Sequence, residues 1–231
     1  MKKKANELKR VITYIGIFIC MTNTTYSQAV KKDLELWTGG NFNLKINKKF
    51  STGIVEQFRF NDTISSLKQA FTQISLKYKI NKSFSIRANY RYSARPNSFN
   101  RNRLSLDFNY AWNKKKFPLS LKYRFRFQDT KTNISGNKGT YIRNKFGVDY
   151  NLTKIVDPFT AFELFYRFNK KNEFRKYRFT LGLDWKLNKR MNIASYYRLQ
   201  RDIGVKKPGL SNIFAILYSY KIKYKKLVGK S

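Results

Sequence analysis

The sequence predicts an all-β protein: a transmembrane, antiparallel up-and-down β-barrel of about 12 strands, with ten as the alternative, after a cleaved signal peptide. Three observations lead to this prediction. Apolar and polar residues alternate with a period of two along most of the chain after Gln28. The alternating segments are long enough to cross a bilayer as tilted strands. Aromatic residues make up 17% of the chain, and on the apolar face they gather near the segment ends, as in an interfacial girdle.

Residues 1–28 are predicted to be the signal peptide. A basic stretch ends at Arg10, an apolar run extends from Val11 to Met21, and a polar segment follows. The apolar run has about half of the roughly 20 residues that a membrane-spanning helix needs, so a retained anchor is the weaker interpretation. We expect cleavage close to Ser27 or Gln28. Residues 29–231 are predicted to form a single domain, the barrel.

Composition argues against several kinds of chemistry. The chain has no histidine, and its one cysteine, Cys20, lies in the predicted signal peptide. Lipid modification of Cys20 is a weaker alternative, because Ile19 stands where a small residue is normally required. The mature chain would therefore lack disulfides, thiolate metal sites and every Ser-His or Cys-His arrangement. No catalytic residue, metal site or cofactor is predicted, and we expect the protein not to be an enzyme.

Eleven segments show the alternation, most regularly the three between Ser83 and Gln128. In chain order the predicted strands are Leu34–Ile46, Phe50–Phe60, Ala70–Ile80, Ser83–Ser93, Arg103–Trp112, Phe117–Gln128, Ile142–Leu152, Phe159–Phe168, Tyr177–Leu187, Met191–Gln200 and Ile213–Tyr224. An even number is expected when both termini lie in the periplasm. We therefore expect either a further strand hidden in Val30–Gly40, which gives twelve, or the loss of one candidate, which gives ten.

Two strands depart from the pattern. Glu56 falls on the apolar face of its strand, and Ile213, Ala215 and Leu217 fall on the polar face of the last strand. A β-bulge would correct the first departure, since one extra residue reverses the facing of all that follow. Short polar turns are expected to alternate with longer links, such as Asp129–Thr140, that would face the cell exterior.

Alternation alone does not show whether the apolar face points into a soluble barrel or out into lipid. Segment length, the aromatic residues at segment ends and the export signal favour lipid, and hence the cell outer membrane of a Gram-negative bacterium. The expected partners are outer-membrane lipid, lipopolysaccharide and the barrel assembly machinery. The alternative is a soluble periplasmic β-barrel that binds an anionic or apolar ligand.

The formal charge of +36 would by itself suggest a nucleic-acid partner. Here, however, the Lys and Arg residues recur at alternate positions within apolar strands, so no nucleic-acid partner is predicted. With the apolar face in lipid they would line the lumen, where guanidinium groups bind carboxylate or phosphate. The candidate ligand-binding residues are Arg87, Arg91, Arg124, Arg126, Arg143, Arg178 and Arg198.

Two roles fit such a lumen. One is a narrow, anion-favouring pore. The other is a plugged, structural barrel in which the arginines pair with loop carbonyls and with the few acids on the same wall. Those acids are Asp107, Asp149, Glu163 and Asp184. Acid–base chemistry by these carboxylates is the weaker interpretation, because neighbouring cations would hold each of them as an ion-pair partner.

Six short stretches, all with an aromatic residue and five of them also with charged residues, follow one another in a characteristic order along the chain: Leu36–Gly39, Glu56–Phe60, Lys122–Gln128, Arg143–Phe146, Glu163–Phe165 and Lys176–Phe179. In this order they resemble a family of bacterial outer-membrane β-barrels known as domain of unknown function 2490. The resemblance covers nearly the whole mature chain. It implies a barrel in the outer membrane and brings no known catalytic residues.

Overall fold

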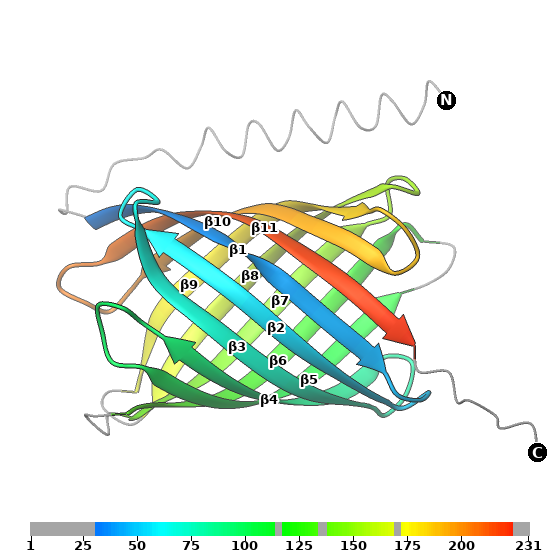
Figure 1. Ribbon diagram of the computed structural model, residues 1–231, viewed down its shortest axis with the longest axis horizontal. Helices are drawn as coiled ribbons and strands as arrows, with labels where there is room; N and C mark the ends of the chain where they lie inside the picture. The colour runs from blue at the N-terminus through cyan, green and yellow to red at the C-terminus, as the bar shows by residue number, and fades with distance from the viewer. Residues whose placement is uncertain (1–30, 114–116, 134–137, 169–171, 224–231) are drawn as a thin grey trace, which may run out of the picture.

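The described residues form a closed β-barrel of eleven strands (Figure 1). A computed structural model describes residues 31–113, 117–133, 138–168 and 172–223, so the predicted signal peptide lies outside the described residues. The strands are β1 (Lys31–Lys45), β2 (Phe50–Asn61), β3 (Ser66–Lys79), β4 (Phe84–Ala94), β5 (Arg101–Asn113), β6 (Leu119–Thr132), β7 (Lys138–Tyr150), β8 (Val156–Phe168), β9 (Glu173–Lys186), β10 (Met191–Asp202) and β11 (Gly209–Lys223). The described residues contain no helix with the length and hydropathy of a membrane span.

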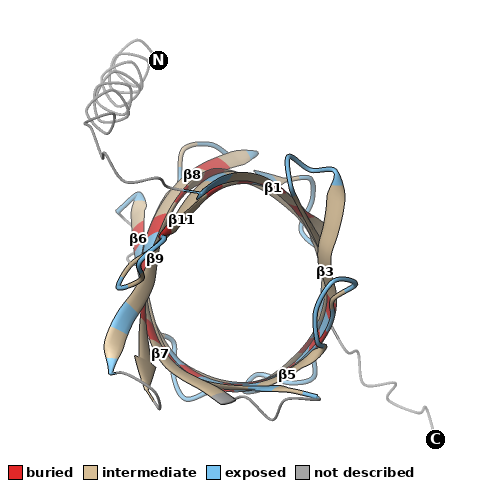
Figure 2. Ribbon diagram, turned by 90° about the vertical axis from the view of Figure 1, so that its left-hand side faces the viewer, coloured by how far each residue is buried: buried red, intermediate tan, exposed pale blue. Residues whose placement is uncertain are grey.

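The barrel closes through a parallel pair. Each strand pairs antiparallel with its neighbour in sequence, but β1 and β11 run in the same direction, from Lys31 opposite Gly209 to Lys45 opposite Lys223. Figure 2 looks along the barrel and shows the ring of strands. An odd number of strands makes the parallel pairing of β1 and β11 unavoidable, because the first and last strands of a meander then point the same way. The expected even count is thus replaced by eleven, since described residues 31–40 belong to β1 and form no additional strand.

The two rims of the barrel carry connections of similar length. The Lys31 rim, where β1 begins, holds the connections 62–65, 95–100, 133–137, 169–172 and 203–208, whereas the Lys45 rim holds 46–49, 80–83, 114–118, 151–155 and 187–190. The expected contrast between short turns and long links is therefore wrong. The strands extend into the polar stretches that the sequence suggested as links: Asp129 pairs with Thr140, and Lys131 with Lys138. Backbone pairing does not require apolar side chains, so the ladder continues past the apolar segment.

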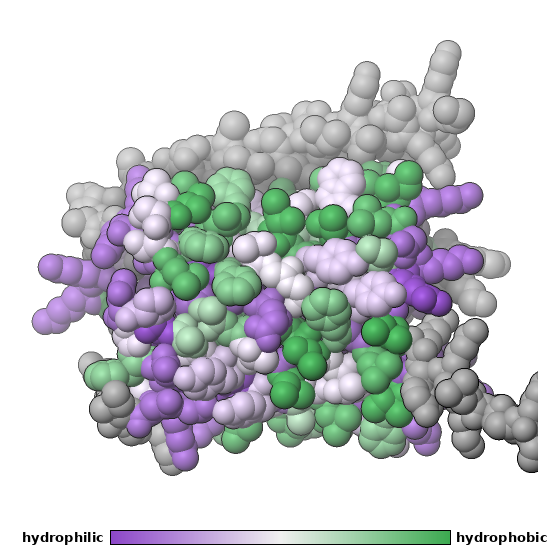
Figure 3. Space-filling model, viewed as in Figure 1, coloured by the Kyte–Doolittle hydropathy of each residue, from purple (hydrophilic) through white to green (hydrophobic). Residues whose placement is uncertain are grey.

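Large apolar side chains cover the outside of the barrel. Leu104 is 62% exposed, Phe146 58% and Ile216 57%, whereas inward neighbours such as Ser105 and Asp107 are buried. Figure 3 shows apolar residues over most of the wall that faces the viewer, with hydrophilic residues gathered at its two ends. The predicted orientation of the two faces is confirmed: apolar side chains point out, and polar side chains point into the barrel.

Aromatic residues form contacts on the outer surface near both rims. At the Lys45 rim the ring centroids of Phe50 and Tyr78 lie 4.9 Å apart, and those of Phe84 and Tyr110 lie 4.8 Å apart. At the Lys31 rim Tyr166 packs edge-on against Phe168 and Phe174. Aromatic residues in bands at both ends of an apolar wall are typical of barrels that sit between two membrane interfaces.

Some polar side chains on the outer wall are satisfied by aromatic donors. The hydroxyl of Tyr123 donates to Asn144 Oδ1 at 2.7 Å, and the Tyr197 hydroxyl donates to Asn212 Oδ1 at 2.6 Å. The indole Nε1 of Trp185 donates to the Ser195 hydroxyl at 2.9 Å. Each pair hides a polar group that would be costly to expose to an apolar environment.

Glu56 stays on the outer face. It alternates with outward Ile54 and Phe58, while adjacent Gln57 points inward and is buried. The expected bulge does not turn Glu56 inward, because the irregularity in the β2–β3 pairing falls between Arg59 and Phe60, beyond Glu56.

The inward apolar residues of β11 form a small core inside the barrel. Ile213 and Ala215 are buried against Trp37 of β1, and Tyr196 packs on the cluster. Parallel pairing sets Ala215 directly opposite Trp37, so apolar side chains meet across the seam that closes the barrel. The departure seen in the sequence of the last strand thus marks the inner side of this seam.

Candidate functional site

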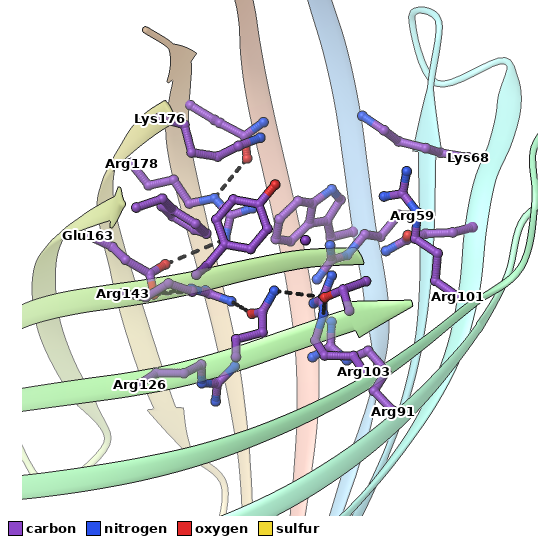
Figure 4. Close-up of a pocket in the computed structure, with 18 of the residues that line it drawn as sticks. Arg59, Lys68, Arg91, Arg101, Arg103, Arg126, Arg143, Glu163, Lys176 and Arg178 are labelled. Carbon is purple, nitrogen blue, oxygen red and sulfur yellow. Dashed lines mark hydrogen bonds and ion pairs between the residues drawn. The ribbon is translucent and has the colours of Figure 1, made fainter. Parts of the chain in front are cut away.

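A cavity of about 620 Å³ lies inside the barrel. Ser98 and Phe99 of the 95–100 connection contribute to it, which places it in the half nearer the Lys31 rim. Basic residues are the largest group in its wall (Figure 4). The lining cations are Arg59, Lys68, Arg91, Arg101, Arg103, Arg124, Arg126, Arg143, Lys145, Lys176, Arg178 and Arg198, and the lining acids among the described residues are Glu35 and Glu163.

One side of the lumen is neutralised by Glu163 of β8. Its Oε1 accepts from Arg143 Nη2 at 2.8 Å and from Arg124 Nη2 at 2.5 Å, and its Oε2 accepts from Arg178 Nη1 at 3.5 Å. Glu163 is only 5% exposed. It therefore joins arginines from β6, β7 and β9, as expected of a buried charge that has paired partners.

A second carboxylate holds Arg126. Asp107 of β5 accepts from Arg126 Nε at 2.5 Å and from Nη2 at 2.7 Å. This two-pronged geometry is the strongest form of a guanidinium–carboxylate contact. Arg124, Arg126, Arg143 and Arg178 thus have acidic partners within the protein.

Across the lumen, Arg59, Arg91 and Arg103 have only neutral hydrogen-bond partners among the described residues. Arg59 donates through Nε and Nη2 to Gln57 Oε1 at 3.1 and 2.8 Å, and Arg91 donates through the same two atoms to Gln73 Oε1 at 3.0 and 2.7 Å. Arg103 donates through Nε to Thr130 Oγ1 at 3.3 Å. An amide or hydroxyl oxygen accepts these hydrogen bonds but adds no negative charge. The positive charge of this side is therefore not neutralised by the groups that hold it.

Like charges face each other directly across neighbouring strands. Arg91 is opposite Arg103, Arg124 is opposite Lys145, and Arg126 is opposite Arg143. Lys77 is opposite Arg87 in the same way, on β3 and β4. Such pairs destabilise a sheet. Anions that entered the lumen would reduce this repulsion and so stabilise the folded barrel.

Three buried aromatic rings orient the arginines. The Cζ atom of Arg59 lies 3.6 Å from the ring centroid of Trp37, that of Arg91 3.6 Å from Phe71, and that of Arg143 4.2 Å from Phe165. The sequence interpretation missed these inward rings because it assigned aromatic residues to the outer face. Their parity was the available signal: Phe71 alternates in step with the inward polar residues Gln73, Ser75 and Lys77.

The structure brings most of the candidate residues to one cavity. Arg91, Arg124, Arg126, Arg143, Arg178 and Arg198 line it. Arg87 does not line it and lies opposite Asp107 and Lys77. Arg59 and Arg103, which were not among the candidates, do line it.

The carboxylates considered for acid–base work each have a partner. Asp107 and Glu163 are in the contacts above, Asp149 pairs with Lys122, and Asp184 accepts from Asn192 Nδ2 at 2.7 Å. Within the described ranges, no group of His, Cys, Asp and Glu could hold a metal ion.

Fold and site together define a closed β-barrel with an apolar outer wall and a basic interior. The chain belongs to the family described as "Protein of unknown function (DUF2490)", which matches residues 34–204. This confirms the resemblance seen in the sequence.

The solved structures that are similar to the chain include two porins. One is described as "KdgM porin in complex with disordered oligogalacturonate", with 16% identity over 71% of this chain and 82% of that chain and a TM-score of 0.44. The other is an anion-selective porin from Comamonas acidovorans, with 12% identity over 72% of this chain and 55% of that chain and a TM-score of 0.38. A comparison with curated proteins found no match.

Proposed function

We propose that the protein is an outer-membrane β-barrel whose lumen forms a narrow, anion-favouring pore. The observation that carries the proposal is that several lumen arginines, among them Arg59, Arg91 and Arg103, have no acidic partner among the described residues. Arg198 is a further case, since it donates to the hydroxyl of Thr180. Fixed cations along a water-filled passage lower the energy of anions there and raise that of cations. A barrel that served only as a scaffold would gain stability if these positions were neutral.

The membrane location rests on the outer wall. Side chains such as Leu104, Phe146 and Ile216 are more than half exposed around a closed barrel, which is unfavourable in water and favourable in lipid. Every backbone ladder is closed, as hydrocarbon requires. We further propose cleavage of residues 1–28 on export, folding by the barrel assembly machinery, and contact of rim lysines with lipopolysaccharide phosphates.

The location is tested by expressing the full chain in a Gram-negative host. We expect the protein in the outer-membrane fraction, with a mature N-terminus close to residue 29 and a gel band that shifts on boiling. A soluble periplasmic product whose band does not shift would instead support the soluble ligand-binding barrel.

The pore is tested by reconstitution into a planar bilayer under a salt gradient. The expected reversal potential has the sign of anion preference, and it should move toward zero at high salt as the lumen charges are screened. Cation preference would overturn the proposal.

A structural barrel is the second candidate, and one observation favours it. Glu163 ties β8 to arginines of β6, β7 and β9 inside the lumen, which reduces the space for ions. A folded, heat-shifted protein that remains silent in bilayers would support this role.

A further inference from the structure

Arg59, Arg91 and Arg103 converge on one wall of the lumen. Arg59 of β2 and Arg91 of β4 both lie over Phe71 of the strand between them, with Cζ atoms 4.9 and 3.6 Å from its ring centroid. Arg103 of β5 lies directly opposite Arg91. Figure 4 shows the three on the side of the cavity away from Glu163. We call them the arginine cluster.

The guanidinium groups of Arg59 and Arg91 are held in fixed orientations. Each has one flat face on an aromatic ring and its Nε and Nη2 atoms on a glutamine oxygen. Among the described residues, no acceptor contacts the Nη1 atom of either group. Because guanidinium donors point along the plane of the group, the remaining donors are available to an acceptor in the cavity.

The cluster differs from the rest of the basic wall in what a ligand would have to displace. A ligand carboxylate near Arg124, Arg143 and Arg178 would compete with the carboxylate of Glu163, which already contacts all three. None of the ion pairs found among the described residues involves Arg59, Arg91 or Arg103. Glu35, the other acid of the cavity, pairs with Lys68 and accepts from Trp37 Nε1. A ligand oxyanion would therefore displace no protein carboxylate from these three arginines, and it would relieve the repulsion between Arg91 and Arg103.

We propose that the arginine cluster is a binding site for oxyanions, and that it selects carboxylate or phosphate groups over simple halides. Arg91 and Arg103 come from adjacent strands and present separate sets of donors. A planar fork matches the two oxygens of a carboxylate or phosphate, whereas a spherical halide cannot use both prongs. This inference rests on the proposed function only in that anions must reach the lumen.

The site is tested by calorimetric titration of the purified, detergent-solubilised full barrel with citrate, inorganic phosphate and sodium chloride at matched ionic strength. We expect citrate or phosphate to bind with a measurable heat and chloride to give none. The more tightly bound of the two would tell whether carboxylates or phosphates are the better ligands. Equal and weak heats from all three salts would overturn the proposal.

Variants assign the binding to the cluster. Arg91→Gln and Arg103→Gln should each weaken citrate or phosphate binding about tenfold, as expected for loss of a charge-assisted hydrogen bond. Arg91→Lys, which keeps the charge but not the fork, should lose several-fold. Arg175→Gln is the matched control, because Arg175 pairs with Glu173 and does not line the cavity. Its affinity should equal that of the wild type. Heat-shifted gel mobility shows whether each variant has folded.

The result separates the site from the pore. Anion-selective conductance without citrate or phosphate binding would overturn the proposed oxyanion site and would still support the proposed pore. Binding that depends on Arg91 and Arg103 in a barrel that does not conduct would establish the site and sink the pore. Binding that is unchanged in folded Arg91→Gln and Arg103→Gln barrels would show that the oxyanion binds elsewhere, and would overturn the assignment.

Discussion

Asp107 and Arg126 form a two-pronged ion pair across β5 and β6, with N–O distances of 2.5 and 2.7 Å. Both side chains are almost completely buried. Arg87 lies opposite Asp107 on β4, and Arg143 lies opposite Arg126 on β7. The carboxylate therefore separates cations that would otherwise repel one another along the lumen wall.

Loss of this carboxylate should destabilise the barrel strongly. We expect Asp107→Asn to lower the free energy of unfolding by about 3 kcal/mol, because it leaves a buried guanidinium without its counter-charge. Asp149→Asn is the control: the Lys122 side chain that pairs with Asp149 is 59% exposed, so the loss should be at most about 1 kcal/mol. Urea unfolding in lipid vesicles measures both, and equal losses would contradict the prediction.

Gly39 should tolerate no side chain. A Cβ atom at this position would lie 2.1 Å from the carbonyl oxygen of Glu56 on the paired strand β2. We expect Gly39→Ala to cost about 2 kcal/mol or more, because backbone atoms must move to admit the methyl group. At adjacent Gly40 the nearest atom is in the Phe42 side chain, 3.4 Å away, so Gly40→Ala should be nearly neutral. Thermal unfolding measures the stability of the two variants. Similar midpoint temperatures would count against the close approach of Gly39 to the Glu56 carbonyl.

Two neighbouring substitutions should have opposite effects if the outer wall meets lipid. Glu56→Leu replaces an outward carboxylate between Ile54 and Phe58, and should stabilise the barrel in vesicles by about 1 kcal/mol. Gln57→Leu removes the acceptor of two Arg59 hydrogen bonds inside the lumen, and should destabilise it by about 1 kcal/mol. Unfolding measurements in vesicles show whether each substitution raises or lowers the free energy of unfolding. Destabilisation by Glu56→Leu would indicate that this face does not contact lipid.

Lys77 should be a source of repulsion that salt can screen. It lies between Ser51 and Arg87 on the inward face and has no acidic partner among the described residues. We expect Lys77→Gln to stabilise the barrel by about 0.5 kcal/mol at low ionic strength, with the gain shrinking as salt is added. Lys48→Gln, in the exposed 46–49 turn, should change stability little at any salt concentration. A gain for Lys77→Gln that does not depend on salt would rule out repulsion as its cause.

The two-residue alternation of apolar and polar side chains made the strands of the barrel predictable, but not the way in which the barrel closes. Strict alternation in segments such as Ser83–Ser93 predicted both the strands and their facing, because a pleated strand can point successive side chains only to opposite sides. The same segments were already eleven in number. The expectation of an even number rests on the rule that both chain termini lie on the periplasmic side of the membrane. That rule does not apply when β1 and β11 pair in parallel.

The candidate site was predictable in composition but not in detail. Parity placed Arg91 and Arg143 on the inner wall. It did not show that Arg143 would meet Glu163 while Arg91 would meet only Gln73. Partners across a barrel depend on register, tilt and side-chain reach, none of which is local in sequence. The inward rings of Trp37 and Phe71 were missed for a related reason: a large aromatic residue suits either wall, and only its neighbours decide which one.

The sequence by itself determined an all-β chain with apolar and basic faces, since the two-residue repeat of a strand is a local property. Only the tertiary structure decided how the ring closes and which arginines have acidic partners. It also decided that Arg59, Arg91 and Arg103 have none within the part of the chain that the structure describes. These outcomes depend on contacts between strands that are distant in sequence. Closing the sheet sets the strand register, and the register determines which charges meet.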